Sequence, residues 1–288
     1  MYAYVLIAII KTTHNIISVY SRKSLDFTWY NAERNTGDRS LKKTKIVSCI
    51  LAIAFLFTGC MSSDAQPINE EDIHFVQFDE IADDAEVAVI HTSVGTIRMV
   101  LFPEEAPNTV AHFRRLVKDG FYTNQRIFGQ SESNTIITGA TDETGGTGKL
   151  LTDDGEAIEC ETTPNLWHFS GAVSVLGYQE NRFSQEYYSD SRFFIIGNVD
   201  ATTDLVNEME EYDYPLKVIN AYKEHGGLPQ FTGAYTVFAQ VYDGLDIVDT
   251  LSQMPTTGDY KELADGVVIE SIELSTYGEE AAKENNKA

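Results

Sequence analysis

Cysteine and basic residues are both scarce in this chain of 288 residues. Three cysteines are too few for a disulfide framework, so the fold must be held by its own core. Lys and Arg together number 21 against 44 Asp and Glu, which gives a formal net charge of −23. Nucleic acids and anionic membrane surfaces are bound through dense basic patches. The acidic balance therefore argues against both kinds of partner.

The motifs of several enzyme classes are missing as well. The six histidines have no metal-ligand spacing, and there is no Gly-x-Ser-x-Gly elbow. A glycine-rich run at 145–149 invites comparison with a phosphate-binding loop, but Glu143 replaces the first required glycine and Leu150 replaces the required Ser or Thr. We interpret that run as an ordinary loop. His168 lies near Cys160 and Glu161, and we interpret this grouping as incidental rather than as a ligand set.

The N-terminal sixty residues are the part of the chain in which Lys and Arg outnumber Asp and Glu. Residues 1–60 hold eight Lys or Arg and three Asp or Glu, whereas residues 61–288 hold thirteen and forty-one. Lysines at 42–45 precede a mostly apolar run at 46–57, and small residues follow at 58–60. This order is typical of a secretory signal, and twelve apolar residues are too few to span a bilayer.

The Thr-Gly-Cys ending of this segment resembles the lipobox of bacterial lipoproteins, although Phe57 stands where Leu is usual. The resemblance implies that residues 1–60 are a leader, that Cys60 is lipidated and that the protein is extracytoplasmic and anchored to the bacterial cell membrane. Cys49 then lies inside the leader and Cys160 stands alone. The alternatives are a plain signal peptide, which gives a secreted protein, or a signal anchor. A further hypothesis is that residues 1–40 are an over-extended gene start, with Leu41 at the true initiation codon.

The hydrophobic pattern of the remaining chain predicts one β-rich domain. Residues 61–84 are polar and acidic and predict a tether, whereas the alternation from Glu86 onward predicts a domain over 85–276. A hairpin is expected from Glu86 to Phe102, followed by an amphipathic helix at 107–118. The pattern predicts further strands at 172–176, 192–196, 236–242 and 267–274, helices at 215–225 and 245–251, and a disordered tail at 277–288. Many strands with few helices favour a closed barrel capped by helices.

Four segments of this domain resemble the cyclophilin-type peptidyl-prolyl cis-trans isomerases. They are residues 92–97, 106–113, 191–195 (Ser-Arg-Phe-Phe-Ile) and 233–241. The resemblance implies a mainly β fold, a closed eight-stranded antiparallel barrel capped by two helices, here with an inserted helix. It also implies a monomer that acts on proline-containing peptides or exported client proteins and needs no cofactor.

The chemistry that the resemblance implies is a rotation about the prolyl amide bond, whose resonance gives a barrier of about 18–20 kcal/mol. A donor aimed at the prolyl nitrogen stabilises only the twisted state, in which the nitrogen lone pair is freed. In the family an Arg within a Phe-His-Arg strand is this donor, and an apolar pocket holds the proline ring. Here residues 128–130 occupy that place, so Gln130 stands where the Arg is expected.

Other site positions also depart from the family. Phe194 keeps the floor of the proline pocket, and Arg192 stands where the family has Gln, so we hypothesise that the Arg192 guanidinium replaces the missing donor. The remaining pocket positions that the resemblance assigns are Ile136, Thr138, Leu176, Gly177, Phe231 and Tyr235. Two functions follow: an isomerase that assists the folding of exported proteins, or a catalytically inactive cyclophilin-like module that binds peptides or proteins.

Overall fold

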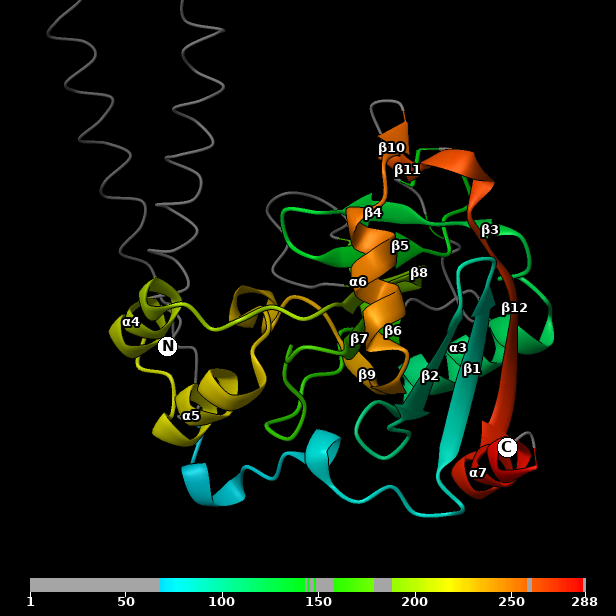
Figure 1. Ribbon diagram of the computed structural model, residues 1–288. Coiled ribbons are helices and arrows are strands. Elements are labelled where there is room, and N and C mark those ends of the chain that lie inside the picture. Colours follow the sequence, from blue (N-terminus) through cyan, green and yellow to red (C-terminus); the bar gives the residue numbers. More distant parts are fainter. Residues whose placement is uncertain are drawn as a thin grey trace, which may run out of the picture. The chain divides into compact units, whose positions relative to one another are not determined.

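The computed structural model describes residues 68–286 except 143, 146–147, 149–157, 179–187 and 258–260 (Figure 1). The predicted leader and Cys60 lie outside the described residues. Residues Ile68–Ala288 make up one compact unit, which contains the predicted barrel domain. Within the described ranges, no helix combines the length and the apolar character that crossing a membrane requires.

The body of this unit is one antiparallel sheet that curls (Figure 1). Its strands are β1 (Glu86–Thr92), β2 (Thr96–Leu101), β3 (Gln125–Arg126), β4 (Phe128–Gln130), β5 (Thr135–Thr138), β6 (Ile158–Glu159), β7 (Ala172–Tyr178), β8 (Tyr188–Ile196), β9 (Val237–Asp243), β10 (Thr256–Thr257), β11 (Glu262–Leu263) and β12 (Val268–Thr276). They follow the order β10-β11-β4-β5-β8-β7-β9-β2-β1-β12-β3, and β6 pairs with β8. Strands β3 and β4 stand near opposite ends of this order, yet only Ile127 separates them in sequence. The sheet must therefore curl to bring its ends together.

The curled antiparallel sheet confirms the predicted mainly β fold. The strand number differs from the predicted eight, because twelve strands are present among the described residues. Four of them, β3, β6, β10 and β11, are only two residues long. Such short pairings have no hydrophobic alternation of their own, so a sequence pattern cannot reveal them.

Two helices cover the barrel, as predicted. The helices of the described chain are α3 (Pro107–Lys118), α4 (Thr203–Glu211), α5 (Leu216–His225), α6 (Leu245–Gln253) and α7 (Tyr277–Asn285). Helix α3 contacts β8 and β12, and α6 contacts β4, β5 and β2 (Figure 1). Phe113 and Leu116 of α3 and Leu251 of α6 are almost fully buried in the main core. Their burial supplies the hydrophobic stabilisation that holds each helix on the sheet.

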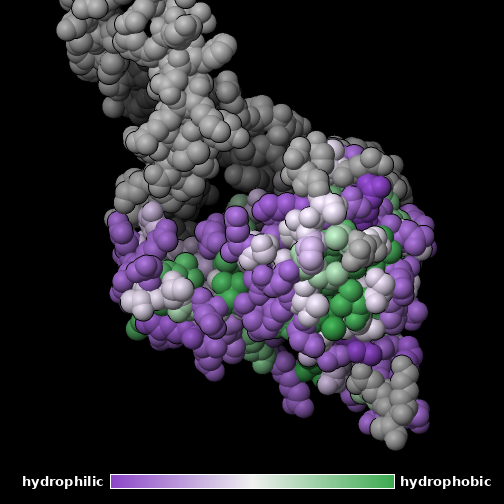
Figure 2. Space-filling view, turned by 45° about the horizontal axis from the view of Figure 1, so that its top comes forward, coloured by the Kyte–Doolittle hydropathy of each residue, from purple (hydrophilic) through white to green (hydrophobic). Residues whose placement is uncertain are grey.

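The inserted segment contains two helices, α4 and α5, rather than the single helix predicted at 215–225. They lie to one side of the barrel in Figure 1 and share a second hydrophobic cluster. Thr202 caps α4, since its side chain accepts a hydrogen bond from the amide of Leu205. Figure 2 shows a largely hydrophilic face on which hydrophobic residues appear in small groups. Among the described residues, Phe78 and Leu216 are the exposed large hydrophobic side chains.

The prediction of an acidic tether over 61–84 is wrong for its described part, residues 68–84. Two short 3-10 helices, Glu70–Asp72 and Val76–Phe78, pack this segment onto the inserted helices and the barrel. Gln77 is buried and its amide nitrogen donates to the Trp167 carbonyl (2.9 Å) and to Gln240 Oε1 (2.8 Å). The Trp167 amide in turn donates to Gln77 Oε1 (2.7 Å). The sequence gives no sign of these partners, because they are 90 and 163 residues away.

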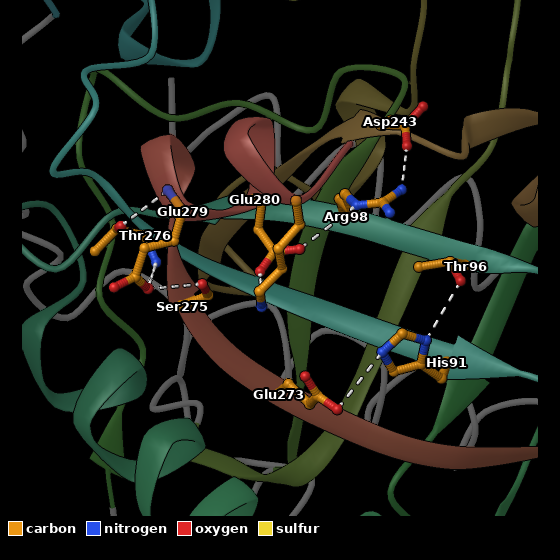
Figure 3. Close-up of polar contacts among 10 residues, drawn as sticks. His91, Thr96, Arg98, Asp243, Glu273, Ser275, Thr276, Glu279 and Glu280 are labelled. Atoms are coloured by element: carbon orange, nitrogen blue, oxygen red, sulfur yellow. Dashed lines mark hydrogen bonds and ion pairs between the residues drawn. The ribbon is translucent and has the colours of Figure 1, made fainter. Parts of the chain in front are cut away.

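The predicted disordered tail is also wrong for its described part, because residues 277–285 form helix α7. Thr276 and Glu279 cap its start reciprocally: the Glu279 amide donates to Thr276 Oγ1, and the Thr276 amide donates to Glu279 Oε2. Figure 3 shows this corner beside the polar outer face of β1, β2 and β12. Glu280 is buried there, accepts a hydrogen bond from Lys283 (2.7 Å) and lies 4.0 Å from Arg98. These tertiary contacts hold a segment that is too polar to be recognised as ordered from sequence.

The start of α3 is capped by a residue from a distant loop. Its N-cap residue, Ala106, offers no capping side chain. Instead the Glu161 carboxylate accepts from the amides of Asn108 (3.0 Å) and Thr109 (2.8 Å), and also from Asn108 Nδ2 (2.9 Å). The Glu161 amide donates to Thr236 Oγ1 (2.8 Å). Glu161 therefore ties the helix, its own loop and the start of β9 together.

We expect Glu161→Ala to lower the free energy of unfolding by about 1–2 kcal/mol, because two helix amides lose their acceptor. Urea unfolding followed by circular dichroism measures the change. Glu159→Ala is the matched control, since Glu159 is an exposed carboxylate two residues away. Equal losses in the two variants would contradict the capping role.

Candidate peptide-binding face

Strand β8 sends alternate side chains into two different clusters. Phe193 and Ile195 enter the main core between the sheet and α3. Phe194 and Ile196 belong to a separate cluster on the other face. Since side chains alternate with a period of two along a strand, the register of β8 decides which residues reach which face. If Phe194 is the floor of the predicted pocket, the pocket lies on the face of β8 that carries Phe194 and Ile196, called the Phe194 face below.

Three aromatic rings meet on this face. The Phe194 ring contacts Phe231 (5.3 Å between centroids) and Tyr235 (5.4 Å), and these two lie 5.5 Å from each other. All three pairs are edge-to-face, a geometry that favours each contact by about 0.5–1.5 kcal/mol beyond burial. Phe194 is only 3% exposed. The structure thus brings together three residues assigned to the pocket, and closes Phe194 beneath the other two.

Ile136 and Thr138 do not lie on the Phe194 face. In the β5–β8 register they stand opposite Ile195 and Phe193 and line a small interior cavity with them. The Thr138 hydroxyl donates to the Arg126 carbonyl (2.9 Å). The assignment of these two residues to the pocket is wrong, because a shift of one residue turns every side chain of a strand to the opposite face.

Ile137 takes the place that had been expected for Ile136. It stands directly opposite Phe194 and packs in the same cluster. Leu176 also packs there, as expected. Gly177 does not, because it pairs with Ser189 beyond an irregularity in the β7–β8 ladder, whereas Ser174 is the residue opposite Phe194.

Gln130 lies on the same face as Phe194 but two strands away. Phe128, Ile137 and Phe194 form one row across β4, β5 and β8, and Gln130 begins the adjacent row. Its Oε1 accepts a hydrogen bond from Lys261 Nζ (3.2 Å). With about 4.8 Å between strands, the Cα atom of Gln130 is about 10 Å or more from that of Phe194.

Arg192 lies two residues before Phe194 on β8 and forms an ion pair with Asp190. Its Nη2 donates to Asp190 Oδ2 (2.6 Å), and its Nε reaches both carboxylate oxygens (3.0 and 3.1 Å). Its Nη1 donates to the Gly145 carbonyl (3.2 Å). Phe128 lies against the same glycine, since a Cβ at Gly145 would meet its ring at 3.2 Å. Arg192 and Phe128 therefore converge on Gly145 from the Phe194 face.

Comparisons with known proteins identify the family of this chain. The family model of cyclophilin-type peptidyl-prolyl cis-trans isomerases matches residues 87–274, which is most of the described unit. The chain belongs to this family. A Staphylococcus aureus protein assigned as a peptidyl-prolyl cis-trans isomerase is 30% identical over 186 residues, or 65% of this chain and 90% of that protein.

One further relative is a longer protein, and another is a solved structure of lower sequence identity. A Streptococcus pyogenes protein assigned as a bifunctional phosphatase and peptidyl-prolyl cis-trans isomerase is 31% identical over 207 residues; the match spans 71% of this chain but only 42% of that protein. The crystal structure of a Cryptosporidium parvum cyclophilin in the presence of the dipeptide Ala-Pro has a TM-score of 0.50 and 21% identity. It covers 66% of this chain and 99% of its own. At that identity the likeness shows a shared fold.

His168 also belongs to the aromatic cluster of this cyclophilin, although the family resemblance did not assign it to the pocket. The His168 ring stacks on Phe194 (6.2 Å, 9° between planes) and meets Phe231 edge-on (5.9 Å). Burial lowers the pKa of His168 to about 3, because a charged imidazolium would be desolvated there. Neither ring nitrogen has a hydrogen-bond partner in the part of the chain that the structure describes. Its position between Trp167 and Phe169 is the one sequence signal of such an apolar setting.

His168 should make the stability of this cyclophilin depend on pH. The unfolded chain binds a proton at His168 below about pH 6.5, whereas the folded chain excludes it until about pH 3. Stability is therefore lost as the pH falls through this window, by at most about 1.4 kcal/mol per pH unit. His168→Phe keeps the ring stacking and removes the effect.

Urea unfolding of the parent and of His168→Phe at pH 7.5 and pH 5.5 tests this. We expect the parent to lose about 1 kcal/mol more than the variant between the two values. Parallel losses in the two proteins would show that His168 is protonated in the folded state or reaches solvent.

Proposed function

We propose that this cyclophilin is an extracytoplasmic peptidyl-prolyl cis-trans isomerase that assists the folding of exported proteins. The observation that carries the catalytic part is the placement of Arg192 and Phe194 two residues apart on β8, with both directed to the same face. The location is supported by the sequence of the leader, with Cys60 as the proposed lipidation site and secretion without a lipid as the alternative. Proline-containing peptides are the proposed substrates, which the Ala-Pro dipeptide used with the Cryptosporidium relative supports.

The proposed mechanism needs a floor for the proline ring and a donor for its nitrogen. Phe194 supplies the floor, and Ile137 and Leu176 supply apolar walls. The Arg192 guanidinium is held beside Asp190, and two residues along a strand span about 7 Å, so the substrate amide must extend from the ring on Phe194 along β8 toward Asp190 to reach it. The Arg192 guanidinium donates to the nitrogen lone pair as the amide twists, so the bond forms fully only in the transition state. A charge-assisted hydrogen bond of about 1.5–3 kcal/mol corresponds to a rate gain of about 10- to 150-fold.

Gln130 is the less suitable donor of the two candidates. It lies two strands away from Phe194. Its amide is also neutral, and a hydrogen bond from a neutral donor is about half as strong as one from a charged donor. We therefore propose that Arg192, on β8, takes the role that the family's Arg has at the position of Gln130 on β4, two strands away.

A second function is favoured by one specific observation, the 3% exposure of Phe194. With Phe231 and Tyr235 packed against it, a proline ring reaches Phe194 only if these rings move. A pocket closed in this way suits a module that binds peptides or proteins through its rim without catalysis. This module would share the fold and the aromatic cluster but have no isomerase activity.

A protease-coupled isomerase assay on the purified full-length chain with Ala-Pro peptides separates the two functions. We expect cis-to-trans conversion above the uncatalysed rate, and a loss of at least tenfold in kcat/KM for Phe194→Leu, because the flat floor is removed. Phe78→Leu is the control, since Phe78 is an exposed aromatic residue of the segment 68–84. A parent rate at background would favour the binding module, and equal rates for Phe194→Leu and the parent would remove Phe194 from the site.

A further inference from the structure

Asp190 is a buried carboxylate beside the proposed donor. Its side chain is 2% exposed, whereas that of Arg192 is 12% exposed. Removing a carboxylate from water is unfavourable unless a cation and hydrogen bonds replace the lost solvent. Arg192 provides both, because its Nε, its Nη2 and its own backbone amide (2.7 Å) all donate to Asp190.

The grip of Asp190 fixes the direction of the whole guanidinium. Both carboxylate oxygens engage the edge formed by Nε and Nη2, at 2.6 to 3.1 Å. A guanidinium is planar and rigid, so holding one edge determines where the opposite corner points. That corner, Nη1, reaches the Gly145 carbonyl at 3.2 Å. The Gly145 carbonyl is a backbone acceptor of the kind that a peptide substrate also presents.

The surrounding backbone leaves Asp190 little freedom. Gly148 passes so close that a Cβ there would lie 2.1 Å from Asp190 Oδ1. On the other side of β8, Ser191 Oγ donates to the Gly139 carbonyl (2.7 Å), and the Tyr122 hydroxyl donates to the Ser191 carbonyl (2.9 Å). Burial, and second the negative charge of Asp190, raise the pKa of Tyr122. The carboxylate is thus enclosed between Gly148 and strand β8.

We propose that Asp190 is a positioning residue for peptidyl-prolyl isomerisation, which holds the Arg192 guanidinium toward the substrate amide. This proposal rests on the proposed function. Asp190 itself does not touch the substrate and acts only through Arg192. Arg192 replaces the family's Gln at its position, and Asp190 supplies the orientation that a long, flexible side chain lacks by itself.

A double-mutant cycle on catalysis tests the proposal. The variants are Asp190→Asn, Arg192→Gln and the double variant, each measured for kcat and KM with Ala-Pro peptides. Asp190→Asn should lower kcat at least fivefold and change KM less than twofold, because the donor loses its orientation while the ring pocket stays intact. Adding Asp190→Asn to Arg192→Gln should change kcat/KM less than twofold. Arg192→Gln alone leaves a buried carboxylate without its cation, so the double variant, which removes both charges, guards against misfolding.

Each outcome decides the proposal. An active parent whose kcat is unchanged by Asp190→Asn overturns the positioning role and leaves the proposed function in place. Equal losses of kcat from Asp190→Asn in the presence and absence of Arg192 also overturn it, because Asp190 would then act independently of Arg192. A parent at the uncatalysed rate overturns the proposed function, and this proposal with it. Thermal unfolding of all four proteins identifies any loss that follows from misfolding.

Discussion

The register of β8 between its neighbours is the constraint on which the candidate site depends. Pairing with β5 sets Phe193 and Ile195 inward, where they pack with α3, and thereby sets Phe194 outward. A slip of one residue would bury Arg192 in the core and expose the core phenylalanine, at a large cost in hydrophobic free energy. The burial of Phe193 and Ile195 therefore also fixes the position of the two residues proposed for catalysis. One face of β8 packs in the main core, and the opposite face carries the candidate site.

On the Phe194 face, the positive charge of Arg192 is paired with the negative charge of Asp190. The chain as a whole carries a net charge of −23, and Arg192 lies close to a buried carboxylate. A buried ion pair is tolerated when its geometry is good and its remaining polar atoms are bonded, which the contacts between Asp190 and Arg192 satisfy. The same pair explains how a guanidinium in an acidic protein keeps one orientation. The proposed donor, Arg192, and the group that orients it, Asp190, lie two residues apart on the same strand.

Regular elements with strong hydrophobic patterns could be predicted from the sequence. The helix at 107–118 was predicted with its observed bounds, because its apolar residues recur at helical spacing and Pro107 marks its start. The longer strands were placed to within a few residues for the same reason. Phe194, Phe231 and Tyr235 were assigned to one pocket from the family resemblance, and the structure brings their rings together.

What could not be predicted depends on contacts between distant parts of the chain. The segment 68–84 is held by Gln77, whose hydrogen-bond partners, Trp167 and Gln240, lie 90 and 163 residues further along the sequence. The pocket assignment of Ile136 failed because the pairing of β5 with β8 places Ile136 opposite Ile195 and Ile137 opposite Phe194, and this register cannot be read from the sequence of β5 alone. His168 was not assigned to the pocket, because its one sequence signal, a position between Trp167 and Phe169, does not show which cluster its ring joins.

The most direct test of the account is a crystal structure of the protein with a bound Ala-Pro peptide. The account predicts the proline ring on Phe194, with the rings of Phe231 and Tyr235 displaced, and Arg192 Nη1 within about 3.2 Å of the prolyl nitrogen or its carbonyl. Asp190 should retain its hold on Nε and Nη2 in that complex. A peptide seated elsewhere, or a proline ring on Phe194 with Arg192 turned away, would contradict the central claim that this face of β8 is the catalytic site.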